Sequence, residues 1–359
     1  MLFRALLPFT KGLWSLTIGP NSTWIVDSAT FLQCFCVSTV YSGILGDVWT
    51  PLLKFAGLPD RWNHRTSNII ILTAAVLFPL SLLKNLSALA FTSMLGAFAV
   101  LYTVLFVLVR GLDGSYNLAE PVGRFLADGA IIKPSFEKST LWNLDFTSLI
   151  LMSNLGLAFI AHYNGPTYYR ELKDTNSKRF GNVSKLSYAI VALLYVITMS
   201  AGYNTFGDTC KGNIMLNYHP DDTLAILGRF ATFFSILFGF PLTMRGAHEG
   251  LWKIAEAWGF PGVKDKHATV AAVLLTVVTS LAINVKDVSL IVGLAGAILG
   301  SFLVYICPPI IYTRAVKLVH GEESDVYKKE RLYLAFIPMG GFIAAMGVYI
   351  TLKDKVFGK

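Results

Sequence analysis

Residues 146–173 read FTSLILMSNLGLAFIAHYNGPTYYRELK, and this stretch decides the fold. No Asp, Glu, Lys or Arg stands between Phe146 and Tyr169, a length beyond the roughly 20 residues that an α-helix needs to cross a bilayer. Within it Asn164, Gly165 and Pro166 are consecutive, and all three disfavour a helix interior. The stretch therefore predicts a membrane helix that is interrupted near residue 164.

Similar uncharged stretches recur along the rest of the chain. They cover residues 28–46, 66–83, 85–109, 186–207, 230–244 (with 223–228 upstream of Arg229), 268–285, 288–313 and 332–352. Strands of a membrane barrel alternate in polarity over about 10 residues, whereas these stretches are longer and uniformly apolar. With residues 146–169 they predict an all-α polytopic membrane protein of nine spans.

The composition excludes other classes of protein. Charged residues make up 14% of the 359 residues, against about 25% in soluble domains, and apolar residues make up 54%. A soluble domain, a disordered chain and a nucleic-acid binder are therefore not expected. The net charge of +8 suits loops that face anionic headgroups at a cytoplasmic membrane surface.

The interruption near residue 164 is the main candidate site. A broken helix frees backbone carbonyls before the break and starts a new half-helix, with a partial positive charge, after it. Transporters use such groups to hold a substrate at mid-membrane depth. The substrate-binding candidates are His162, Tyr163, Asn164, Gly165 and Pro166. The alternative is that an ordinary span ends at Gly165 and that the Asn-Gly-Pro sequence is its exit turn.

Three further residues are candidates from other stretches. Arg229 follows Asp222 inside an apolar segment, so its side chain either reaches the water at the membrane surface or lines a gate. Ser235 could offer an oxygen to a sodium ion or bond its own helix. Tyr41 stands among small residues and is a gating or structural candidate.

Catalytic and metal-binding motifs are lacking from the sequence. It contains no HExxH, Walker loop, GxGxxG or CxxC, and its six histidines are scattered. We therefore expect no enzyme, no catalytic residue, no metal site and no cofactor. Gly293, Gly296, Ala297, Gly300 and Ser301 instead predict a small-residue face for close helix packing.

Five segments together resemble the amino acid/auxin permease family. They are YSGILGDVWTPLLK at 41–54, AFIAHYNGPTYYRELKD at 158–174, SAGYNTFGD at 200–208, GFPLTMRGAHEGL at 239–251 and VGLAGAILGSFLVYICPPIIY at 292–312. The resemblance implies a leucine-transporter-like inverted-repeat fold, usually with eleven spans. The nine stretches look like the third to eleventh of these, so we expect a fold incomplete at its N-terminus. Residues 1–20 are expected to form a cytoplasmic lead-in and residues 21–359 the transporter domain.

The resemblance also implies a function. Members of this family are secondary active transporters that move amino acids by ion-coupled alternating access. The coupling ion is expected to be Na+ or H+, and the partners are the amino-acid substrate and the lipid bilayer. A sodium-ligating threonine that the family carries near the position of Pro241 has no match at Gly239 or Phe240. The alternative is a transport-inactive membrane-embedded regulatory or sensor protein, or a partial gene product. The expected location is the plasma membrane or the vacuolar or lysosomal membrane.

Overall fold

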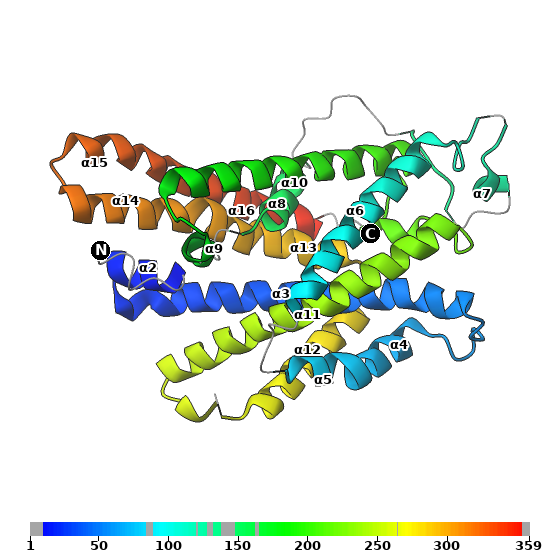
Figure 1. The fold of residues 1–359 in the computed structure, drawn as a ribbon, viewed down its shortest axis with the longest axis horizontal. Helices are drawn as coiled ribbons and strands as arrows, with labels where there is room; N and C mark the ends of the chain where they lie inside the picture. Colours follow the sequence, from blue (N-terminus) through cyan, green and yellow to red (C-terminus); the bar gives the residue numbers. More distant parts are fainter. Residues whose placement is uncertain are drawn as a thin grey trace.

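The computed structural model describes residues 10–83, 89–119, 121–127, 132–137, 148–161, 165–263 and 265–353. Its helices lie side by side, most of them along the long axis of the molecule (Figure 1). Within these residues no strand forms, and a single parallel bridge joins Ser135 to Gly207. The prediction of an all-α membrane protein is confirmed.

The helices follow one another in a simple order along the chain. Their bounds are α2 Thr10–Thr17, η1 Pro20–Ser22, α3 Thr23–Phe55, α4 Arg65–Leu72, η2 Thr73–Leu77, α5 Phe78–Ser81, α6 Leu89–Leu112, α7 Arg124–Ala127, α8 Ser148–Ala158, α9 Gly165–Glu171, α10 Ser177–Phe206, η4 Ile214–Leu216, α11 Thr223–Ala257, η5 Pro261–Val263, α12 His267–Asn284, α13 Val288–Ala295, η6 Gly296–Ile306, α14 Cys307–His320, α15 Asp325–Glu330, η7 Arg331–Ala335 and α16 Phe336–Leu352. Several adjoin without a gap, so that α13, η6 and α14 form one rod from Val288 to His320.

Seven helical segments in the described part of the chain are long and apolar enough to cross a membrane. They match seven of the nine predicted stretches. The stretch 66–83 forms a shorter continuous rod, Arg65–Ser81, and the stretch 146–169 is divided between α8 and α9. A count of nine spans stays a prediction.

Helices α3 and α11 cross at the centre of the molecule, and α6 packs on α11 (Figure 1). Trp49 of α3 stacks on Phe233 of α11 with ring centroids 4.5 Å apart. Gly250 of α11 lies so close to the backbone of Phe31 that a Cβ atom would come within 3.0 Å of its Cα. Burial of these apolar faces forms the main core of the protein.

A second contact layer joins α8, η6 and α16 through small residues. A Cβ atom on Gly296 would lie 2.2 Å from the carbonyl oxygen of Ser153, and one on Gly347 would lie 2.9 Å from the Cβ of Ala297. The small-residue face predicted from the sequence is therefore confirmed as a packing surface. Residues 296–306 within it wind as a π-helix, a conformation that often occurs at functional sites.

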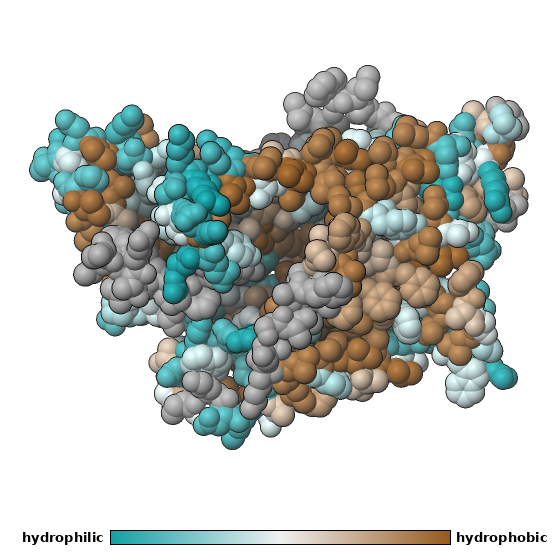
Figure 2. Space-filling view, viewed as in Figure 1, coloured by the Kyte–Doolittle hydropathy of each residue, from teal (hydrophilic) through white to brown (hydrophobic). Residues whose placement is uncertain are grey.

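The surface of the molecule is apolar around its middle and polar at both ends (Figure 2). Helix α10 contributes apolar side chains that are half exposed or more, including Leu186, Ile190, Leu193 and Val196. A water-soluble protein would not expose such a band, whereas a bilayer would cover it. The surface agrees with an integral membrane protein.

One end of the molecule, here called the α7 end, is held by two buried ion pairs. Arg110 of α6 binds both carboxylate oxygens of Asp222, at 2.9 and 2.6 Å, and Asp222 caps α11 by accepting from the N–H of Leu224. Tyr116 also donates to Asp222, at 3.0 Å. Burial and the neighbouring carboxylate raise the pKa of Tyr116 above its usual value, so its hydroxyl remains a hydrogen-bond donor at neutral pH.

The second pair joins Asp47 of α3 to Arg65 of α4, with Nε and Oδ1 2.7 Å apart. Asn213 donates to the other oxygen of Asp47, and Arg65 also donates to the carbonyls of Ala282 and Gly43. The sequence alone suggests that Asp47 caps a helix or meets water. The side chain is instead buried, because Arg65 and Asn213 fold over it.

Gly296→Ala is expected to lower the free energy of unfolding by about 1–3 kcal/mol, because the new methyl group overlaps the Ser153 carbonyl and must separate η6 from α8. The thermal unfolding midpoint of the detergent-solubilised protein measures this. Gly341→Ala on α16 is the control, since a Cβ there meets no atom within 4 Å. Equal midpoints in the two variants would contradict the close contact.

Arg110→Met is expected to destabilise the protein by about 3–5 kcal/mol, because it leaves the fully buried Asp222 without its cation. Arg179→Met removes an exposed pair with Asp174 and should cost less than about 1 kcal/mol. Chemical denaturation in detergent compares the two variants. If Arg110→Met lowers the free energy of unfolding as little as Arg179→Met does, the pair of Arg110 with Asp222 contributes little to stability.

Candidate functional site

The helix predicted to be interrupted near residue 164 is interrupted. Helix α8 ends at Ala158, residues 160–161 are not helical, and α9 begins at Gly165, with Pro166 as its second residue. The candidates His162, Tyr163 and Asn164 lie outside the described residues. A helix that continues unbroken through residues 159–161 is therefore excluded, while the position of the break within the membrane, rather than at an exit turn, stays a prediction. Helix α9 has only seven residues, so backbone groups at the break, more than a helix dipole, are available for binding.

Two tyrosines of α10 hold the end of α8. The hydroxyl of Tyr195 donates to the carbonyl of Ala158 at 3.0 Å, and that of Tyr188 donates to the carbonyl of Phe159 at 3.4 Å. The ring of Phe159 packs against both tyrosine rings. Carbonyls freed by a helix break need partners in a membrane, and α10 supplies them.

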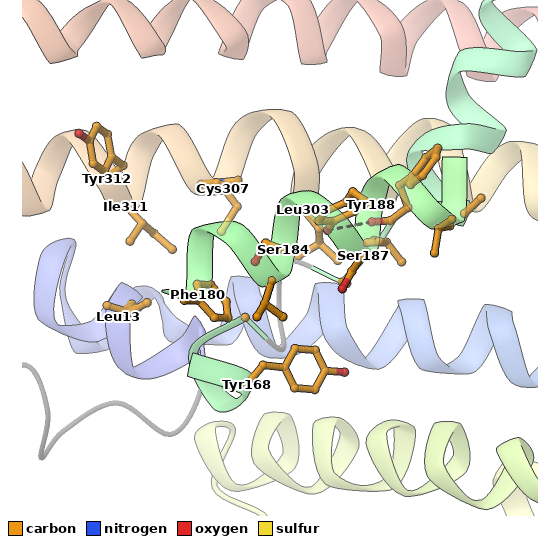
Figure 3. Close-up of a pocket in the computed structure, with 18 of the residues that line it drawn as sticks. Leu13, Tyr168, Phe180, Ser184, Ser187, Tyr188, Leu303, Cys307, Ile311 and Tyr312 are labelled. Atoms are coloured by element: carbon orange, nitrogen blue, oxygen red, sulfur yellow. Dashed lines mark hydrogen bonds between the residues drawn. The ribbon is translucent and has the colours of Figure 1, made fainter. Parts of the chain in front are cut away.

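A cavity of about 840 Å³ lies beside the break, between α8, α9, α10 and α14. Figure 3 shows α10 running between Tyr168 of α9 and Cys307 of α14. The wall of this cavity is mainly apolar with a few hydroxyl groups. It comprises Leu13, Ala158, Phe159, Ile160, Ala161, Gly165, Tyr168, Phe180, Val183, Ser184, Ser187, Tyr188, Val191, Tyr195, Leu303, Cys307, Pro308, Ile311, Tyr312 and Ala315. Gly165 is the sequence-predicted candidate that lies on this wall.

A second cavity of about 340 Å³ lies between α3, α8, α11 and α13. Its wall comprises Gln33, Cys34, Cys36, Val37, Val40, Tyr41, Leu157, Ala158, Ile160, Thr243, Val292 and Ala295. Ala158 and Ile160 line both cavities, so the end of α8 stands between them. The structure thus brings Tyr41 to the same helix break as Gly165.

Gln33 is a polar residue of this cavity that no sequence motif singles out. Its side chain is 2% exposed, and its Oε1 atom has no hydrogen-bond partner. The available signal was that Gln33 is the only amide in the stretch 28–46. A buried amide without a partner costs free energy, so such a group calls for an explanation.

The described walls of both cavities lack formal charge. No Asp, Glu, Lys, Arg or His occurs among the described residues that line them. Hydroxyl groups, one carboxamide and the backbone at the break are therefore the polar groups available. Such a site can bind a small molecule through hydrogen bonds. The described residues also contain no cluster of three or more His, Cys, Asp or Glu able to hold a metal ion.

Comparison with known proteins identifies the family. The sequence profile described as "Transmembrane amino acid transporter protein" matches residues 12–353, nearly the whole chain. The chain belongs to this family. Its homologues are named as transporters rather than enzymes.

Three relatives illustrate the similarity. The chain is 30% identical over 225 residues to Vacuolar amino acid transporter 7 of Saccharomyces cerevisiae, covering 62% of this chain and 42% of that protein. It is 25% identical over 296 residues to Vacuolar amino acid transporter 5 of Schizosaccharomyces pombe, covering 82% and 66%. It is 22% identical over 349 residues to Putative sodium-coupled neutral amino acid transporter 11 of Bos taurus, covering 96% and 70%. The chain spans 42% to 66% of the length of these two fungal relatives.

The other two candidates of this transporter-family protein lie away from the break. Ser235 faces Gly96 of α6 and lines a separate cavity of about 240 Å³. Arg229 is buried and donates to the carbonyls of Met215 and Tyr218, at 3.1 and 2.8 Å. The expectation that its side chain reaches water is wrong, because the segment before α11 folds back over it and supplies these carbonyls.

Tyr195→Phe is expected to raise the rate of amide hydrogen exchange in residues 159–161 roughly fivefold, because it removes a hydrogen bond worth about 1 kcal/mol from the end of α8. Exchange measured by mass spectrometry on the detergent-solubilised protein tests this. Tyr203→Phe is the control, since that hydroxyl lies on the same helix and donates to Asp208, at 3.4 Å, rather than to α8. Unchanged exchange in Tyr195→Phe would show that the tyrosine does not hold the break.

Proposed function

We propose that this protein moves amino acids across a membrane by ion-coupled alternating access, and that it binds them at the break between α8 and α9. The observation that carries the proposal is an interrupted helix with an uncharged cavity on each side, in a member of an amino acid transporter family. The names of the relatives support amino acids as the substrate class.

The chemistry of the break suits a zwitterion. Backbone N–H groups at the break can donate to a carboxylate, while carbonyls of residues 160–161 lie past the end of α8 and can accept from an ammonium group. His162, Tyr163, Asn164, Gly165 and Pro166 remain the proposed substrate contacts. The amino acid's side chain would then occupy one of the two apolar cavities.

The coupling ion and the membrane are also part of the proposal. One relative is named as sodium-coupled and two as vacuolar, which supports Na+ as one candidate ion and the vacuolar or lysosomal membrane as the location. H+ remains the other candidate ion. Ser235 is kept as the proposed ion contact, although it lines a cavity between α6 and α11 rather than the break. Uptake driven separately by a sodium gradient and by a pH gradient distinguishes the two ions.

Asn164→Ala and Pro166→Ala are each expected to lower amino-acid uptake by roughly 10- to 100-fold, because each removes a group or a turn on which binding at the break depends. Uptake of a panel of radiolabelled amino acids by the protein reconstituted into liposomes measures this. Asn182→Ala is the matched control, since Asn182 is exposed on α10.

Three outcomes separate the possibilities. Loss of uptake in both variants, with Asn182→Ala unchanged, supports the site. Normal uptake in Asn164→Ala and Pro166→Ala would remove the break as the binding point. No uptake of any amino acid by the unmodified protein under either gradient would contradict transport itself.

A further inference from the structure

Gln33 of α3 is the buried polar group that the proposed binding at the break leaves without a role. Gln33 is 2% exposed, its Oε1 has no hydrogen-bond partner, and the residue lines the 340 Å³ cavity beside the end of α8. Two hydroxyl groups near this cavity do have partners: Ser38 donates to Thr243 at 3.0 Å, and Thr243 donates to the carbonyl of Phe240 at 2.9 Å.

A buried carboxamide oxygen without a partner is destabilising unless something completes its hydrogen bonds. The cavity has room for that partner to be a small molecule, since 340 Å³ lies at the lower end of the range of about 300–1,000 Å³ for ligand pockets. Most other residues of the cavity wall have aliphatic or thiol side chains, and Val37, Val40 and Val292 are among them. A ligand group that enters the cavity therefore meets Gln33 and the hydroxyl residues Tyr41 and Thr243 in an otherwise mostly apolar wall.

The missing charges limit what that ligand group can be. No charged side chain lines the described part of the cavity. A lysine, arginine, aspartate or glutamate side chain would be buried there without a counter-charge, which is strongly unfavourable. A neutral side chain with one hydrogen-bonding group matches both the carboxamide and the apolar wall.

We propose that Gln33 is a specificity-determining residue, which hydrogen-bonds the polar side chain of a neutral amino acid such as threonine or glutamine in the cavity between α3, α8 and α11. This assignment rests on the proposed transport function, because it places the substrate's side chain next to the break that holds its backbone groups. It predicts that the protein prefers a polar amino acid over an apolar one of similar size.

Pairs of similar size test the preference: threonine against valine, and glutamine against methionine. The unmodified protein should favour the polar member of each pair, both in uptake by proteoliposomes and in equilibrium binding to the detergent-solubilised protein. Gln33→Met keeps the length of the side chain and removes its hydrogen-bonding groups. In both uptake and binding, this variant should lower the preference for threonine over valine, and for glutamine over methionine, by roughly 5- to 150-fold, because one buried hydrogen bond is lost. Valine binding should persist and shows that the variant is folded.

Two further variants complete the experiment. Leu32→Met is the control, because Leu32 precedes Gln33 on α3 and is 45% exposed on the outer face of the molecule. Its ratios should equal those of the unmodified protein. Gln33→Asn retains the carboxamide on a shorter stem, so it should favour the longer glutamine over threonine relative to the unmodified protein.

The remaining outcomes distinguish the role of Gln33 from the transport function. Unchanged ratios in Gln33→Met, or equal loss of all four amino acids in both Gln33 variants, would assign Gln33 a packing role and overturn the specificity proposal alone. Binding with the expected ratios but without uptake would support the Gln33 assignment and contradict transport. Neither binding nor uptake of any amino acid by the unmodified protein would overturn both.

Discussion

A backbone that leaves the helical conformation must still satisfy its polar groups, and the end of α8 shows how this protein meets that requirement. The chain breaks between Ala158 and Gly165, where consecutive Asn, Gly and Pro residues prevent a continuous helix. Tyr195 and Tyr188 of α10 then bind the carbonyls at the end of α8. A cavity lies on either side of the end of α8.

Packing around the break combines very close contacts with open space. Gly296 and Gly300 allow the rod of α13, η6 and α14 to touch the backbone of α8, and Gly250 allows α11 to touch α3. At the α7 end, the buried pairs of Arg110 with Asp222 and of Arg65 with Asp47 join segments that are far apart in the sequence. These contacts hold the helices together. The two cavities at the end of α8 are the open space that a ligand could enter.

The interruption of the helix was predictable, and the reason is local. Asn164, Gly165 and Pro166 disfavour a helix interior, and Gly165 and Pro166 stand at the start of the new helix α9. The surroundings of Arg229 were not predictable, because the carbonyls that it binds belong to residues 215 and 218, whose position depends on how the loop folds back. Gln33 was overlooked because a single amide in an apolar helix has the same local pattern whether it faces a partner, a lipid or a cavity.

The sequence by itself determined the class of the protein: long uncharged stretches can only be stable as membrane helices, and consecutive helix-breaking residues interrupt one of them. The tertiary structure alone decided which side chains meet at the interruption. Gln33 and Tyr41 of α3 and Thr243 of α11 line one cavity at the end of α8, and Tyr188 and Tyr195 of α10 line the other, because helices distant in the chain pack side by side. Hydropathy reports how a residue partitions between water and lipid, and it carries no information about which neighbouring helix a given face will contact.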